Sequence, residues 1–111
     1  MNADQWLQKV DDQIHALDKL ECVGADDLAL VCDIIFIDDL PNLPEPHISQ
    51  DEEDNTILSM TNGLKNLDLV FDDYGHIHAY WGEADTFRED KCYHMFEWEI
   101  TESLFRWLVT E

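Results

Sequence analysis

Basic residues are what this chain has least of. Its 111 residues include 6 Lys plus Arg against 26 Asp plus Glu, so the formal net charge is −20. A surface of that sign repels phosphate groups, which excludes direct nucleic-acid binding, and it disfavours contact with anionic lipid. No apolar stretch is long enough to span a bilayer, and no apolar run follows a basic N-terminal segment. We therefore expect a cytoplasmic protein that does not associate with membranes.

Catalytic motifs are also missing. There is no GxSxG, HExxH or phosphate-binding glycine loop, and the chain has only 4 Gly. Asp51, Glu53 and Asn55 imitate the first positions of a calcium loop, but Thr56 replaces its glycine and Asn62 its glutamate. No pair of carboxylates has a spacing typical of a general acid and base. We expect neither an enzyme nor a bound cofactor.

The three cysteines do not have the pattern of a disulfide framework. They are odd in number, contain no CxxC, and lie at Cys22, Cys32 and Cys92. This usage predicts reduced, largely buried thiols in a cytosolic protein. Cys92 beside Lys91 has the surroundings of an activated thiol, but a buried structural cysteine is the commoner outcome.

The histidines raise the question of a metal. His76 and His78 form one i, i+2 pair, and Cys92 and His94 form another, so adjacent strands would permit a zinc site. In the register expected below, His76 faces outward opposite Asp72. We therefore expect surface imidazoles beside carboxylates and no metal.

Enough apolar residues are present to build a core. Hydrophobic residues make up 45% of the chain and aromatic residues 11%, which decides against disorder. Length and pattern predict a single α+β domain over residues 1–111, with two N-terminal helices, an antiparallel meander of about four strands and a C-terminal helix. We expect the helices to cover one face of the sheet.

The helices have recognisable ends. Asn2 and Gln5 have capping-box spacing, which predicts a helix from Ala3 to Cys22 that stops near Gly24. Asp26 or Asp27 then caps a second helix, and its apolar side consists of Leu28, Val31, Cys32 and Ile35. Thr101 is expected to cap the last helix. An extended connector is predicted for residues 38–46, because Pro41 and Pro44 fall within it.

Two turn signals predict the register of the sheet. Asn62-Gly63 is typical of a two-residue hairpin loop and would pair Leu58 with Leu67 and Thr56 with Leu69. Residues 73–75 suit a three-residue loop with a left-handed Gly75. That second turn sets three pairs: Phe71 opposite Ile77, Leu69 opposite Ala79, and Leu67 opposite Trp81. Residues 82–90 are expected to form an acidic loop, and residues 93–98 a further strand.

The middle of the chain resembles a group of small bacterial proteins of unassigned function. The shared features are an LPxPxI connector (Leu43 to Ile48), an acidic turn (Asp51 to Asn55) and a later Asp-Asp-Tyr-Gly turn. Asn55 stands where that pattern has Gly. The resemblance implies helices joined to a meander and carries over no catalytic residue. Size and charge also resemble the small acidic proteins of phages and mobile elements that act as nucleic-acid mimics.

The charge itself is the main functional signal. Self-repulsion at −20 costs stability, so we interpret the charge as retained for a basic protein partner, with solubility and halophilic adaptation as open alternatives. On a strand, Glu97 and Glu99 would lie roughly 6.6 Å apart, much like successive phosphates. Tyr74, Tyr80 and Tyr93 are expected on the open face of the sheet, where they would anchor a partner.

The expected partner-binding residues are carboxylates and two of these tyrosines. They are Asp51, Glu52, Glu53, Asp54, Asp68, Asp72, Asp73, Tyr80, Glu83, Asp85, Glu89, Asp90, Tyr93, Glu97 and Glu99. Two partners fit: the nucleic-acid-binding site of a host defence protein, as for anti-CRISPR or anti-restriction inhibitors, or a basic toxin held by its antitoxin or immunity protein. Either would act as a monomer or homodimer, in the host cytoplasm if a phage encodes it.

Overall fold

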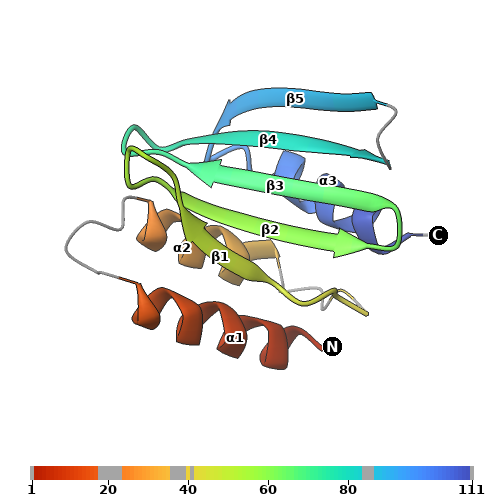
Figure 1. The fold of residues 1–111 in the computed structure, drawn as a ribbon, viewed down its shortest axis with the longest axis horizontal. Helices are drawn as coiled ribbons and strands as arrows, with labels where there is room; N and C mark the ends of the chain where they lie inside the picture. The colour runs from red at the N-terminus through yellow and green to blue at the C-terminus, as the bar shows by residue number, and fades with distance from the viewer. Residues whose placement is uncertain (1, 18–23, 36–39, 41, 84–86, 111) are drawn as a thin grey trace.

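The chain folds into an antiparallel sheet with three helices on one face. The computed structural model describes residues 2–17, 24–35, 40, 42–83 and 87–110. In chain order the elements are α1 (Ala3–Ala16), α2 (Ala25–Ile35), β1 (His47–Gln50), β2 (Thr56–Asn62), β3 (Lys65–Phe71), β4 (His76–Glu83), β5 (Phe87–His94) and α3 (Trp98–Val109). The strands lie in the order β1-β2-β3-β4-β5 (Figure 1). The predicted α+β class is confirmed, with five strands instead of about four.

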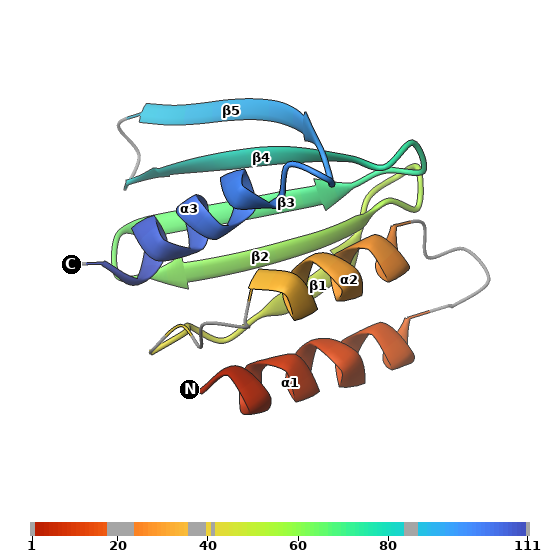
Figure 2. The ribbon, with the colours of Figure 1, turned by 180° about the vertical axis from the view of Figure 1, so that it is seen from behind.

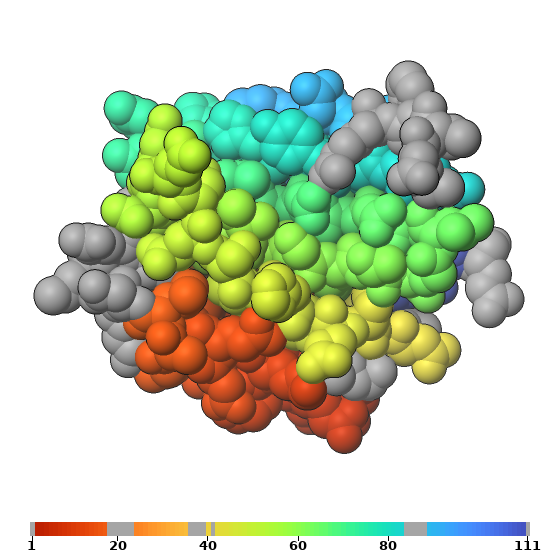
Figure 3. Space-filling model, viewed as in Figure 1, coloured from red at the N-terminus to blue at the C-terminus, as the bar shows by residue number. Residues whose placement is uncertain are grey.

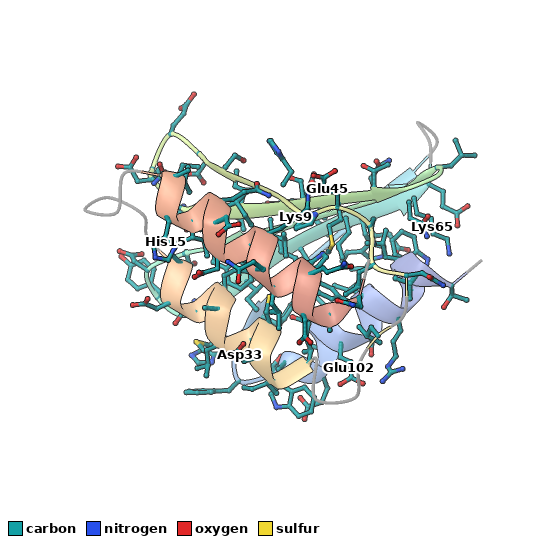
Figure 4. All side chains as sticks on the ribbon, turned by 90° about the horizontal axis from the view of Figure 1, so that it is seen from below. Lys9, His15, Asp33, Glu45, Lys65 and Glu102 are labelled. Atoms are coloured by element: carbon teal, nitrogen blue, oxygen red, sulfur yellow. The ribbon has the colours of Figure 1, made fainter. Side chains whose placement is uncertain are left out.

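The helices and the sheet form two layers. Seen from behind, α2 and α3 lie across the sheet (Figure 2), and the edge view places all three helices on the same side (Figure 4). Residues along the strands alternate accordingly, with Leu58, Met60, Leu67 and Leu69 buried beneath the helices. The opposite face of the sheet lies at the molecular surface, with α1 along its border (Figure 3). None of the described helices is long and apolar enough to cross a bilayer.

The first two helices follow the predicted pattern in part. The capping box is confirmed, because Gln5 N–H donates to Asn2 Oδ1 at 2.8 Å and Asn2 N–H donates to Gln5 Oε1 at 3.2 Å. α1 ends at Ala16, short of the predicted Cys22, and residues 18–23 lie outside the described residues. α2 buries all four predicted side chains. It begins at Ala25, so the two aspartates predicted as caps occupy its first turn instead.

The first hairpin differs from the prediction by two residues. Its loop consists of Gly63, with a φ of 62°, and Leu64, so Asn62 pairs with Lys65 and Leu58 pairs with Leu69. Asn62 remains in the strand, and its Nδ2 donates to the carbonyl of Leu108 at 2.7 Å, at the end of α3. Because side chains alternate with a period of two, this shift leaves the predicted buried face unchanged.

The second hairpin is confirmed in register. Phe71 pairs with Ile77, Leu69 with Ala79, and Leu67 with Trp81. Gly75 has a φ of 75°, the left-handed conformation that the three-residue loop requires.

The prediction for the C-terminal third is wrong in three respects. Residues 87–90 of the expected acidic loop belong to β5, and the strand predicted for residues 93–98 ends at His94. A charged edge strand lacks the apolar alternation by which interior strands are recognised, and its charges oppose edge-to-edge aggregation. The third error concerns Thr101, which is buried inside α3; Glu97 occupies the N-cap without a side-chain cap bond.

Both termini contribute to one core. Trp6 of α1 packs edge-to-face on Phe105 of α3, with ring centroids 5.7 Å apart. Gln13 closes the outer edge of β1, because its Oε1 accepts the N–H of Ile48 at 2.7 Å and its Nε2 donates to the carbonyl of Pro46 at 2.8 Å.

The predicted connector falls partly within residues 36–39 and 41, which are outside the described residues; residues 42–46 have no regular structure.

Candidate partner-binding surface

Carboxylates gather at one end of the molecule. In a meander the β1–β2 and β3–β4 turns lie at the same end of the sheet, and α1 ends and α2 begins there too (Figure 1). We name the carboxylates of these segments the acidic pole. Its members are Asp11, Asp26, Asp27, Asp51, Glu52, Glu53, Asp54, Asp72 and Asp73.

Part of the acidic pole surrounds a hollow. The cavity has a volume of about 500 Å³ and is lined by side chains that include Asp11, Asp26, Asp27, Asp72 and Asp73. Burial together with the charges of Asp26 and Asp72 raises the pKa of Asp27 above its usual value. The carboxylates are therefore close enough to repel one another, which concentrates negative potential at this end.

The described Lys and Arg side chains lie outside the acidic pole, and most of them bind a carboxylate or a carbonyl of this chain. Lys9 binds Glu45 at 2.8 Å, and Arg106 binds Glu102 at 3.0 Å on α3. Lys65 Nζ donates to the carbonyls of Trp107 and Thr110, at the end of the molecule opposite His15 (Figure 4). Lys91 is exposed on β5. Within the described part of the chain, no Lys or Arg side chain interrupts the acidic pole.

Two members of the acidic pole build their own turns. Asp51 accepts the N–H groups of Glu53 and Asn55 at 2.9 and 3.0 Å. Asp72 Oδ1 accepts the N–H groups of Tyr74 and His76, each at 2.9 Å, and its Oδ2 lies 2.9 Å from His78 Nε2. For both carboxyls, partial burial raises the pKa, but the hydrogen bonds outweigh it and leave the pKa below its usual value.

Three predicted partner-binding residues have a different role or geometry. Tyr93 is 4% exposed and faces the helices, where its Oη lies 2.6 Å from Thr101 Oγ1. It is therefore a core residue and not an anchor on the open face. Glu97 and Glu99 lie at the start of α3, so the phosphate-like spacing expected for a strand does not exist there. Glu97 and Glu99 remain exposed carboxylates.

The other predicted residues are dispersed beyond the acidic pole. Asp68, Tyr80 and Asp90 occupy paired positions on β3, β4 and β5, so they form a row across the open face. Glu83 lies at the far end of β4, and Glu89 is exposed on β5. Asp85 lies outside the described residues. The structure thus brings together the two acidic turns but not the complete predicted set.

Sequence reasoning missed three members of the acidic pole. Asp26 and Asp27 are predicted only as helix caps, and Asp11 is not among the predicted binding residues. Their position beside the β3–β4 turn depends on how α1 and α2 pack on the sheet. The sequence holds one local signal for this packing, the glycine at position 24. Gly24 directly precedes α2 with a φ of 82°, and a Cβ there would lie 2.4 Å from the carbonyl oxygen of Phe71. That glycine lets the start of α2 approach the end of β3.

Three histidines and one cysteine lie on two neighbouring strands. β4 and β5 are neighbours, and they pair His76 with His94 and His78 with Cys92. Among the described residues, no three His, Cys, Asp or Glu side chains are arranged to hold a metal ion. Cys32 is buried, and burial raises the pKa of its thiol. Cys92 is exposed, contrary to the prediction, because it pairs with His78 on the open face of the sheet, whereas the neighbouring Tyr93 faces the helices. Cys22 lies outside the described residues.

No family model, no curated protein and no solved structure matches this chain.

Proposed function

We propose that this chain is a non-catalytic binding protein whose acidic pole occupies the nucleic-acid-binding surface of a basic host protein. The observation that supports this is the concentration of carboxylates from four separate segments at one end, without a described Lys or Arg among them. A surface that binds phosphates through Lys and Arg is attracted to such a field. Inhibition of a defence protein, of the anti-CRISPR or anti-restriction type, is the setting in which such blocking has a use.

The mimicry proposed here is electrostatic and does not copy the spacing of phosphates. The carboxylates of the acidic pole lie on turns and helix ends, so they do not form a ladder along one strand. Exposed members such as Asp26, Glu52 and Asp73 are available to a partner, whereas Asp51 and Asp72 hold the turns in shape. Fast association that weakens with salt is the expected signature of this arrangement.

The test begins with capture of partners from a bacterial lysate on the immobilised chain, followed by competition. We expect the captured protein to bind DNA or RNA, and to be released by high salt and by added nucleic acid. Asp26→Asn/Glu52→Gln should lose most of the capture. Asp4→Asn/Asp33→Asn removes the same charge from exposed helix positions outside the acidic pole and should retain it.

Two outcomes would redirect the proposal. If nucleic acid does not compete for the captured protein, blocking of a nucleic-acid site is the wrong mechanism. If the captured protein is a toxin whose activity the chain suppresses, the role of antitoxin or immunity protein replaces that of defence inhibitor.

A further inference from the structure

Two exposed aromatic side chains border the acidic pole. Tyr74 and Phe96 are each 76% exposed. The N–H of Met95 donates to the carbonyl of Gly75 at 2.8 Å, which ties the β3–β4 turn to the turn after β5. Tyr74 directly precedes Gly75, and Phe96 directly follows Met95. We name Tyr74, His94 and Phe96 the aromatic corner.

The ring of Phe96 is held in place although it is exposed. Its N–H donates to Nδ1 of His94 at 3.2 Å, and the two rings lie 4.6 Å apart with an interplanar angle of 31°. His94 in turn packs edge-on against His76, with centroids 5.5 Å apart. The Phe96 ring is thus backed by His94 and otherwise open to solvent. A ring already ordered in this way loses little side-chain entropy when a partner covers it.

Carboxylates flank the aromatic corner. Asp72 and Asp73 share a turn with Tyr74, and Glu97 follows Phe96 directly. Asp27 is near enough to His94 and Asp72 for their charges to act on its pKa. An aromatic face beside several carboxylates complements a group that is both cationic and planar.

We infer that the aromatic corner docks an arginine side chain of the basic partner, with the guanidinium stacked on Phe96 and bound by Asp73 or Glu97. This inference rests on the proposed function and specifies its contact. Arginine fits better than lysine because its guanidinium is planar, is weakly hydrated, stacks on rings and presents a fork of donors to carboxylates. A lysine ammonium would be attracted by the same charges without the stacking.

The test compares an oligo-arginine peptide with an oligo-lysine peptide of equal length, each titrated into the full chain at low salt. Stacking of a cation on an exposed ring contributes about 0.5–1 kcal/mol, so Phe96→Ala should weaken oligo-arginine binding about 2- to 5-fold. Oligo-lysine binding should change less, because an ammonium is attracted to a ring but is strongly hydrated and cannot stack on it as a planar guanidinium does. Phe96→Leu keeps apolar bulk but lacks the ring, and it should behave like Phe96→Ala. Leu64→Ala is the control, because Leu64 is 70% exposed at the other end of the sheet.

The outcomes separate this inference from the proposed function. If Phe96→Ala binds oligo-arginine as the unmodified chain does, while Asp26→Asn/Glu52→Gln does not, the aromatic corner is wrong and the acidic pole stands. Equal losses with Phe96→Ala and Leu64→Ala, or with both peptides, would also refute a stacked arginine. If neither peptide binds at low salt, the acidic pole and the aromatic corner fail together.

Discussion

Gly24 is the residue on which the approach of α2 to the sheet depends most directly. Its φ of 82° is left-handed, and a Cβ there would lie 2.4 Å from the oxygen and 2.6 Å from the Cβ of Phe71. We expect Gly24→Ala to cost about 1–2 kcal/mol for the left-handed conformation and about 1–3 kcal/mol for the overlap. Gly63→Ala is the matched control, since Gly63 has a φ of 62° and open space around it. Urea unfolding should show a clearly larger loss for Gly24→Ala.

Asp72 is the carboxylate that holds the β3–β4 turn. Its pKa is lower in the folded chain than in the unfolded chain, so it stabilises the fold above the unfolded pKa of 3.8 and loses that contribution as pH falls through the folded pKa. Hydrogen bonds to a charged group contribute about 1.5–3 kcal/mol, so Asp72→Ala should cost about that much at pH near 7. Asp72→Asn should cost less, because its oxygen still accepts the turn N–H groups.

Urea unfolding at neutral pH and at about pH 3 measures this contribution. The difference in unfolding free energy between Asp72→Asn and the unmodified chain should be smaller at the acid pH than at neutral pH. A gap of the same size at both pH values would show that the charge of Asp72 does not stabilise the turn.

At the scale of elements, α3 is joined to β5 by one buried hydrogen bond. Tyr93 Oη and Thr101 Oγ1 lie 2.6 Å apart, and burial, partly offset by this bond, raises the pKa of Tyr93 to about 12. Tyr93→Phe and Thr101→Val each leave a buried partner unsatisfied, which costs about 1–3 kcal/mol. The double variant should cost less than the two single losses combined, and a double-mutant cycle of unfolding free energies measures the difference.

The tyrosine also gives a pH test of this contact. A folded pKa above the unfolded value of 10 means that Tyr93 favours the fold below pH 10, and that this contribution is lost as pH rises towards about 12. In the double-mutant cycle of Tyr93→Phe and Thr101→Val, single losses of unfolding free energy that simply add up would mean that the two hydroxyls act independently.

The elements that could be predicted from sequence are those whose signals are local. The capping box at Asn2 and the loop at Gly75 each involve residues within a few positions of one another, and both were confirmed. The sequence does not locate β5, because an edge strand need not alternate apolar residues. It also does not distinguish a buried threonine from a capping one, which is why the prediction for Thr101 is wrong. Six of the nine members of the acidic pole are among the predicted binding residues, and the three helical members are not, because they reach the turns through long-range packing.

At the scale of the whole molecule, the concentration of charge should make stability depend on salt. Added salt screens repulsion between carboxylates, so we expect the melting temperature to rise between low and moderate ionic strength. Asp27 should contribute to this effect, because its pKa is raised first by burial and then by repulsion from Asp26 and Asp72, and salt screens the repulsion. A raised folded pKa means that the ionised form destabilises the fold at neutral pH. This penalty shrinks as pH falls below the folded pKa and is gone below the unfolded pKa of 3.8.

Asp27→Asn should therefore raise the melting temperature at neutral pH and low salt. The gain should shrink as salt is added and also at acid pH, where Asp27 is protonated. Asp4→Asn is the control, because Asp4 holds a first-turn position in α1 outside the acidic pole, where its charge favours the helix dipole. We expect Asp4→Asn to lower the melting temperature slightly or leave it unchanged. If Asp27→Asn and Asp4→Asn raise the melting temperature equally, the repulsion is spread over the whole surface. The acidic pole would then not be a distinct site for a basic partner.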